Sequence, residues 1–148
     1  MNLNDPFAAA FEKARAAAQA GEVPVGAALA RAGVVIAAAG NRTLRDRDPT
    51  AHAEMLVIRQ AAATLGSERL VDCDLYVTLE PCAMCAAAIS FARIRRLYFA
   101  ASDPKGGAVE HGPRFFAQPT CHHAPEVYGG IRESEAARML RDFFQARR

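Results

Sequence analysis

The side chains best suited to chemistry lie in two short stretches: His52 with Glu54, and Cys82 with Cys85 directly after Pro81. An imidazole and two thiolates are a good ligand set for zinc. Cys82 and Cys85 are three residues apart, so on a helix they share a face, and a helix N-terminus stabilises their thiolates. Three protein ligands leave the fourth zinc position open for water, whose pKa the metal lowers from about 15.7 to near 7.

Glu54 is the natural proton carrier of such a site. It is two residues from His52, so it need not bind the metal, and a carboxylate beside the bound water can move a proton to a ring nitrogen and a leaving amine. The alternative is a closed structural zinc site with a fourth protein ligand. Four further side chains could supply that ligand: Cys73, Cys121, His122 and His123. The pairing of His-x-Glu with Cys-x-x-Cys favours the catalytic interpretation, because Glu54 then has a chemical role.

Length and composition are typical of one globular domain. The chain has 148 residues, of which 51% are hydrophobic and 23% charged. We therefore expect a single domain over residues 1–148 that buries its own core. Apolar stretches are far shorter than the ~20 residues of a membrane helix, and residues 1–6 do not resemble a signal peptide. These features predict a cytoplasmic protein with no membrane partner.

Charge is distributed unevenly along the chain. Residues 1–92 carry eight Lys and Arg and ten Asp and Glu, a net of −2, whereas residues 93–148 carry ten and six, a net of +4. Nearly all the basic side chains are arginines, which suit bidentate contact with phosphate. The pattern fits an ordinary solvated surface and also fits a polyanionic partner.

Local patterns place the candidate ligands at the starts of helices. Thr50 is the expected N-cap of one helix, and Pro81 is expected to open another at its first position. Expected helices span residues 7–20, 51–65, 82–92 and 133–147, and expected strands span residues 23–29, 34–39, 73–79 and 97–101. Residues 102–125 contain four prolines and are expected to be irregular. The alternation of strands and helices predicts a three-layer α/β domain.

The His-x-Glu and Pro-Cys-x-x-Cys pair is the signature of zinc-dependent nucleobase deaminases. A wider similarity is carried by residues 21–27, 48–54, 75–85 and 141–144. On these residues the chain resembles the bacterial tRNA-specific adenosine deaminases, within the cytidine and deoxycytidylate deaminase superfamily. The resemblance implies a three-layer α/β/α fold with a central mixed five-stranded sheet, a Zn²⁺ cofactor, and homodimers that share substrate contacts between subunits.

The resemblance also implies an activity and its residues. The activity is hydrolytic deamination of adenosine to inosine at the wobble position of a tRNA anticodon stem-loop, with the base flipped into the pocket. Glu54 is the implied catalytic residue, and His52, Cys82 and Cys85 are the implied zinc ligands. The implied substrate contacts are Asn41, the main-chain N–H of Ala53, Asp103, Lys105, Phe143, Phe144, Arg147 and Arg148. By residue type alone, Asn41 also suits a turn and the two phenylalanines also suit a core.

Some positions depart from that family pattern. Phe91 stands at an expected histidine, an alanine follows Cys85 at an expected glycine, and residues 107–112 differ from the usual small-residue loop. These departures concern RNA contact rather than the zinc ligands. One alternative function is a deaminase of a free nucleobase or nucleoside, of guanine or cytosine type, on the same fold. Another alternative is a non-catalytic, zinc-stabilised binding module.

Overall fold

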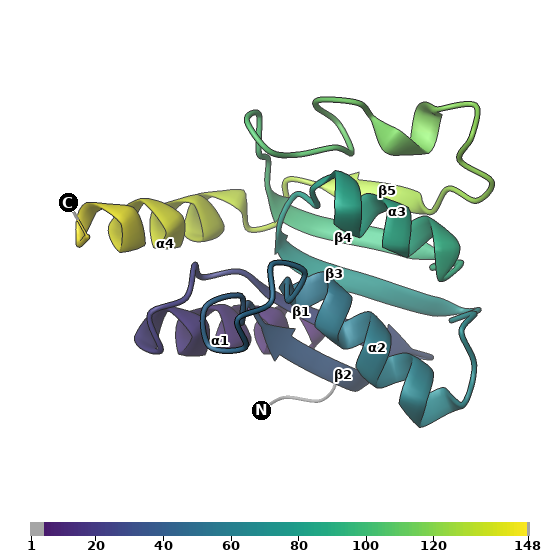
Figure 1. Ribbon diagram of the computed structural model, residues 1–148, viewed down its shortest axis with the longest axis horizontal. Coiled ribbons are helices and arrows are strands. Elements are labelled where there is room, and N and C mark those ends of the chain that lie inside the picture. The colour runs from purple at the N-terminus through teal and green to yellow at the C-terminus, as the bar shows by residue number, and fades with distance from the viewer. Residues whose placement is uncertain (1–4, 148) are drawn as a thin grey trace.

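Five strands and four α-helices account for most of residues 5–147, the part of the chain that this computed structural model describes (Figure 1). The helices are α1 (Pro6–Gln19), α2 (Ala53–Leu65), α3 (Ala83–Phe91) and α4 (Glu133–Gln145), and a short 3₁₀ turn spans Phe115–Ala117. The strands are β1 (Gly26–Arg31), β2 (Val34–Gly40), β3 (Cys73–Leu79), β4 (Arg96–Ala101) and β5 (Glu126–Gly129).

The strands form one mixed sheet in the order β2-β1-β3-β4-β5. β1 pairs antiparallel with β2 and with β3, whereas the β3–β4 and β4–β5 pairs are parallel. Parallel neighbours need a crossover connection. α3 provides the crossover from β3 to β4, and the long segment after β4 provides the one to β5. The five-stranded mixed sheet of the predicted fold class is confirmed.

Helices cover both faces of this sheet and complete the three predicted layers (Figure 1). Side chains of a strand alternate between the two faces. Leu75 and Val77 of β3 belong to the core beneath α2 and α3, whereas Tyr76 between them packs with Phe11 of α1 and Ala136 of α4. The sheet is thus buried on both sides around β3, the strand that leads directly into the Cys-x-x-Cys stretch.

The alanine-rich helix α1 packs closely on the start of β1. Ala10 and Ala14 are fully buried, and a Cβ atom at Gly26 would collide with the backbone of Ala10. Only glycine permits this approach of two backbones. The contact fixes where β1 begins, and so it positions the short segment before β1 that carries Val23 and Val25.

The helix starts differ from prediction in a way that matters for the metal ligands. Thr50 does not cap α2; His52 does, with extended backbone angles. Likewise, α3 begins at Ala83 with Cys82 as its N-cap, so Pro81 precedes the helix instead of opening it. Neither cap forms a side-chain capping hydrogen bond. The predicted caps were wrong because two ligand side chains occupy positions that Ser, Thr, Asp and Asn usually fill.

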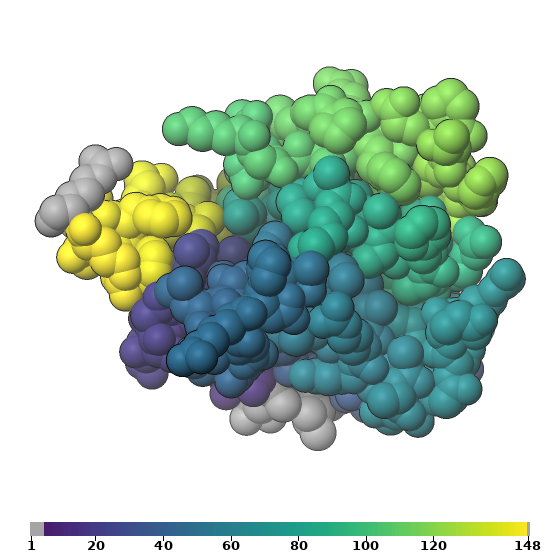
Figure 2. Space-filling view, in the orientation of Figure 1, coloured from purple at the N-terminus to yellow at the C-terminus, as the bar shows by residue number. Residues whose placement is uncertain are grey.

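Other differences concern the sheet edges. β1 begins at Gly26 instead of residue 23, because Val25 N donates to Val23 O in a tight turn. β5 was not among the strands predicted from local pattern, since its four residues are mostly exposed and show no apolar alternation. The segment 102–125 is largely irregular, as predicted, apart from its 3₁₀ turn. Figure 2 shows this segment, in green, along the upper edge of the molecule, next to the teal region that contains α3.

Within residues 5–147, no helix is both long enough and apolar enough to cross a membrane.

Candidate active site

Three potential metal ligands come together at the starts of α2 and α3. His52 and Cys82 are the two N-caps, and Cys85 lies in the first turn of α3. Their ligand atoms all lie within 4.8 Å of one another. His52 Nδ1 is 3.6 Å from Cys82 Sγ and 3.5 Å from Cys85 Sγ. One imidazole and two sulfurs converging on one point are a donor set that fits zinc.

In the metal-free protein, the three potential ligands His52, Cys82 and Cys85 differ in how strongly each holds a proton. A hydrogen bond from the Cys85 thiol is the main cause that lowers the pKa of Cys82 to about 4. The same bond, together with burial, raises the pKa of Cys85. A hydrogen bond to Cys82 raises the pKa of His52. Cys82 is therefore the thiolate in the metal-free protein, and zinc binding must displace the proton that Cys85 holds.

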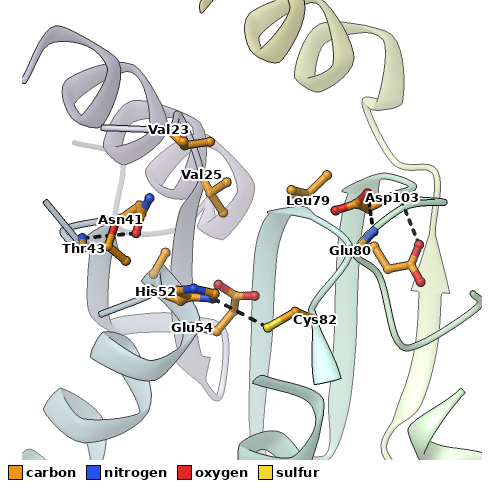
Figure 3. A pocket seen from close by; sticks show the side chains of 12 residues that line it. Val23, Val25, Asn41, Thr43, His52, Glu54, Leu79, Glu80, Cys82 and Asp103 are labelled. Atoms are coloured by element: carbon orange, nitrogen blue, oxygen red, sulfur yellow. Dashed lines mark hydrogen bonds between the residues drawn. The ribbon is translucent and has the colours of Figure 1, made fainter. Parts of the chain in front are cut away.

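Glu54 lies in the first turn of α2 and is only 4% exposed. Burial is the main cause that raises the pKa of its carboxyl group to about 7 in the metal-free protein. Figure 3 shows the Glu54 carboxyl group beside His52 and Cys82. A buried carboxyl group that exchanges a proton near neutral pH, next to a metal site, is suited to proton transfer.

A cavity of about 340 Å³ opens above these residues (Figure 3). His52, Glu54 and Cys82 line it together with residues from two opposite sides. One side consists of Val23, Val25, Asn41 and Thr43, and the opposite side contains Leu79, Glu80 and Asp103. Gly106 also lines the cavity. The volume lies at the lower end of the range for small-molecule pockets. It is of the scale of a single flat ring system with a few polar contacts.

Asn41 stands at the end of β2 and lines the cavity. It is 8% exposed, its backbone N–H donates to Val25 O at 3.0 Å, and its Oδ1 accepts a weak hydrogen bond from Thr43 N at 3.4 Å. Ala53, also in the cavity lining, is the first residue of α2. The first N–H groups of a helix have no partners within the helix. The structure thus brings Asn41, Ala53 and Glu54 to one cavity.

Asp103 and Lys105 occupy the opposite loop. Asp103 lines the cavity, and its Oδ1 accepts from Lys105 N at 3.2 Å and Gly106 N at 2.9 Å. These hydrogen bonds fix a tight turn. Lys105 itself is exposed and does not line the cavity, so only Asp103 reaches the pocket directly.

The candidate residues of α4 lie apart from the cavity. Phe143 is 8% exposed, whereas Phe144 is 48% exposed, and the two rings meet edge to face. The Arg147 guanidinium lies 3.5 Å from the Phe143 ring centroid and donates to Phe143 O. Arg148 lies outside the described residues. Phe143 is therefore mainly a packing residue, while Phe144 and Arg147 are open to solvent.

The four alternative ligands do not join the triad. Cys73 is buried at the start of β3, where its Sγ donates to Val71 O. Cys121 contacts Ser90 Oγ, and His123 Nε2 lies 2.7 Å from Ile94 O. His122 is exposed. Among the residues described, His52, Cys82 and Cys85 are the group of three that the geometry offers to a metal, which leaves a coordination position for water.

Sequence reasoning missed two buried carboxyl groups that hold the loops around the cavity. Glu22 accepts from Leu44 N at 3.1 Å, from Arg45 N at 2.8 Å and from Arg45 Nε at 3.2 Å, and so fixes the loop after Asn41. Burial by itself would raise the pKa of Glu22, but the hydrogen bonds from Leu44 and Arg45 have the larger effect, so the pKa is lowered. Glu80 plays the corresponding part for the loop after β4. Its one sequence signal was its place directly before Pro81.

Comparison with known proteins agrees with this geometry. Residues 3–101 match the family model of the cytidine and deoxycytidylate deaminase zinc-binding region. The tRNA-specific adenosine deaminase of Agrobacterium fabrum (strain C58 / ATCC 33970) is 65% identical over 139 residues, which are 94% of this chain and 91% of that protein.

Solved structures show the same fold in two groups of enzymes. One comes from work on A-to-I editing by tRNA:A34 deaminases at the wobble position of transfer RNA. It has 65% identity and a TM-score of 0.89, over 90% of this chain and 96% of that one. Another is a guanine deaminase from Nitrosomonas europaea, with 26% identity and a TM-score of 0.75, over 95% of this chain and 88% of that one.

Proposed function

Because this chain belongs to the cytidine and deoxycytidylate deaminase family, and within it to the tRNA-specific adenosine deaminases, we propose that it converts adenosine to inosine at the wobble position of a tRNA anticodon loop. The observation that carries the reaction type is the buried carboxyl group of Glu54 beside His52, Cys82 and Cys85 at one cavity. The assignment of the substrate rests on the 65% sequence identity with the Agrobacterium enzyme.

The residues divide the reaction among them. Zinc, when held by His52, Cys82 and Cys85, supplies a Lewis acid that lowers the pKa of a water molecule to near 7. Glu54 accepts one proton of the attacking water and delivers it to N1 of adenine; it then accepts the remaining proton from the oxygen added at C6 and delivers it to the exocyclic amine, which leaves as ammonia. The oxygen that adds at C6 becomes the carbonyl oxygen of inosine, so atoms and protons balance.

The cavity orients the base for that step. In the proposed complex, the Asn41 amide and the N–H of Ala53 hydrogen-bond the ring edge, and Val23, Val25 and Leu79 contact its faces; all five residues line the cavity. An unpaired loop base enters at the lowest cost, because it needs little unstacking. These residues thus select a purine that has already left its helix.

The remainder of the stem-loop would contact residues outside the cavity, on the loop beside its opening and in the basic C-terminal end. Asp103 and Lys105 stand on one loop beside the opening, and Phe144, Arg147 and Arg148 belong to the basic C-terminal end. Arginine is well suited to phosphate, and residues 93–148 carry a net charge of +4. We place Phe143 as the support of Arg147 instead of a direct RNA contact, because it is mostly buried. A tRNA substrate implies a cytoplasmic enzyme.

We propose, as the family resemblance implies, that the enzyme is a homodimer in which both subunits contribute to RNA binding. Phe91, at the end of α3, is 72% exposed, so its ring is available for contact with a second subunit. Sedimentation at micromolar concentration should give twice the subunit mass. A monomer that remains fully active on RNA would contradict the shared site.

The second candidate is deamination of free guanine, favoured by the structural match to the Nitrosomonas enzyme. The deciding experiment offers zinc-loaded protein an anticodon stem-loop with a wobble adenosine, the same stem-loop with that adenosine base-paired, and free adenosine, guanine and cytidine. Inosine and ammonia from the first substrate alone support the proposal. Rapid turnover of free guanine without turnover of the stem-loop would replace it with the second candidate.

A further inference from the structure

Glu80 is a buried carboxyl group that takes no part in the proton transfers described above. It is 2% exposed and follows β3 directly. Its Oε1 accepts from Asp103 N at 2.9 Å and from His111 Nδ1 at 2.8 Å. Its Oε2 accepts from the backbone N–H groups of Val109 at 3.1 Å, Glu110 at 2.9 Å and His111 at 3.2 Å. Five N–H groups therefore point at one carboxylate.

All five donors belong to the loop of residues 103–111, in which Asp103 and Gly106 line the cavity and Asp103 lies opposite Asn41. The loop is wrapped tightly around the carboxylate: a Cβ atom at Gly107 would lie 2.5 Å from Glu80 Cδ and 2.5 Å from Asp103 O. Ala108 N adds a hydrogen bond of 2.9 Å to Pro81 O. The loop is thus fastened to the two residues that immediately precede the zinc ligand Cys82.

We propose that Glu80 is a positioning residue for the substrate, which holds the loop 103–111 at a fixed place relative to the zinc ligands. The expected effect of Glu80 on RNA binding rests on the proposed function, because Asp103 and Lys105 can contact the RNA only if the loop is held in position. The side-chain donor His111 adds a charge-assisted hydrogen bond of 2.8 Å to the attachment.

An amide of the same shape cannot accept the hydrogen bonds that the Glu80 carboxylate accepts from the loop. Donors approach both oxygens, so a glutamine turned either way must present its NH₂ group to N–H groups of the loop. Glu80→Gln therefore breaks the attachment without opening a void. Asp74→Asn is a matched control, since Asp74 is also a buried carboxyl group on β3 but pairs with Arg95 at 2.8 Å, away from the loop.

The first measurement needs no substrate. Amide hydrogen exchange in residues 103–111, and trypsin cleavage after Lys105, should accelerate at least about tenfold in Glu80→Gln, since a hydrogen bond to a charged group is worth a factor of that order or more. Asp74→Asn should leave both rates unchanged. His111→Ala removes one donor and should give a smaller acceleration in the same segment, whereas the exposed His122→Ala should give none.

The second measurement uses zinc-loaded enzyme and the wobble-adenosine stem-loop. Glu80→Gln should raise KM about tenfold and change kcat by less than about threefold, with one zinc retained per chain. A merely structural residue would lower the amount of active enzyme and leave KM alone. Unchanged exchange at 103–111, or loss of zinc with an unchanged KM, would overturn the proposal.

Failure of the proposed function is distinguishable from failure of this inference. If wild-type protein does not deaminate the stem-loop, the substrate assignment falls, and with it the substrate role of Glu80. The exchange experiment still decides whether Glu80 holds the loop. If Glu80→Gln does not fold, His111→Ala decides the same point through the local exchange rates.

Discussion

Replacing Glu54 by glutamine should nearly abolish deamination while leaving the protein folded and zinc-loaded. The change keeps the shape of a side chain that is 4% exposed, and it leaves His52, Cys82 and Cys85 untouched. Only proton transfer is lost, which contributes typically 10²–10⁴-fold to a rate. The loss corresponds to about 3–5 kcal/mol in the activation barrier. Single-turnover deamination of the stem-loop measures it directly.

The same substitution should stabilise the metal-free protein at neutral and alkaline pH. The pKa of Glu54 rises from 4.5 to about 7 on folding. Above pH 4.5 the unfolded chain releases this proton while the folded protein still holds it, so the cost of burying the carboxyl group grows up to about pH 7 and then stays constant. It reaches about 3 kcal/mol, at roughly 1.36 kcal/mol per pKa unit.

Urea denaturation of the two metal-free proteins at pH 5 and pH 8 isolates this effect. Titrating groups that do not interact with Glu54 are common to both proteins, so they cancel in the comparison, whereas His52 and Cys85, whose pKa values Glu54 raises, contribute to the measured difference. The advantage of Glu54→Gln in free energy of unfolding should grow by roughly 2–3 kcal/mol between the two pH values. An advantage that does not vary with pH would refute the reasoning about burial. Near-normal turnover would refute the reasoning about proton transfer, and loss of zinc would make Glu54 a ligand.

Three further predictions concern the metal and the RNA. Zinc analysis should give one ion per chain, unchanged in Cys73→Ser and reduced in His52→Ala. Loss of zinc from Cys73→Ser would instead support the hypothesis of a closed structural site with Cys73 as the fourth ligand. Arg147→Ala with Arg148→Ala should weaken stem-loop binding and reduce the slope of log K against log salt by about 0.7 to 0.9 for each phosphate that is no longer neutralised; an unchanged slope would remove these arginines from the interface. Asn41→Ala should lower turnover and discrimination between bases while the salt slope stays the same, because contacts to bases determine sequence specificity and contacts to phosphates fix the position of the nucleic acid. A flattened slope would instead indicate that Asn41 contacts the RNA phosphate backbone.

The zinc triad and the fold class could be predicted because their signals are local. The spacing of Cys82 and Cys85 is itself a helical geometry, and alternating strands and helices define the layers. The exact starts of α2 and α3 could not be predicted. Rules for N-caps favour Thr50 because its hydroxyl can bond the backbone, whereas the chain uses His52 and Cys82 at the caps for their metal-binding atoms.

The loop anchors could not be read from the sequence because their contacts are long-range. Glu22 lies 22 positions before Leu44, and Glu80 lies 30 positions before Glu110. No periodicity links such residues, and an isolated glutamate usually indicates an exposed surface. β5 was missed for a related reason: with few buried residues, it is a strand mainly by its pairing with β4.

Two carboxylates buried under the loops have a consequence for how this enzyme can be altered. Glu22 and Glu80 hold the loops mainly through backbone N–H groups, so apart from Arg45 and His111 the side chains of these loops are not needed for the attachment to the two carboxylates, and Leu44 is accordingly 71% exposed. The zinc ligands and Glu54 lie at the starts of α2 and α3, whereas the loop tips lie outside these helices. Randomising the exposed positions 44, 46, 104 and 105, while keeping Arg45 and Gly106, should therefore yield libraries rich in folded, zinc-loaded variants, from which new preferences for flanking sequence can be selected without rebuilding the catalytic centre.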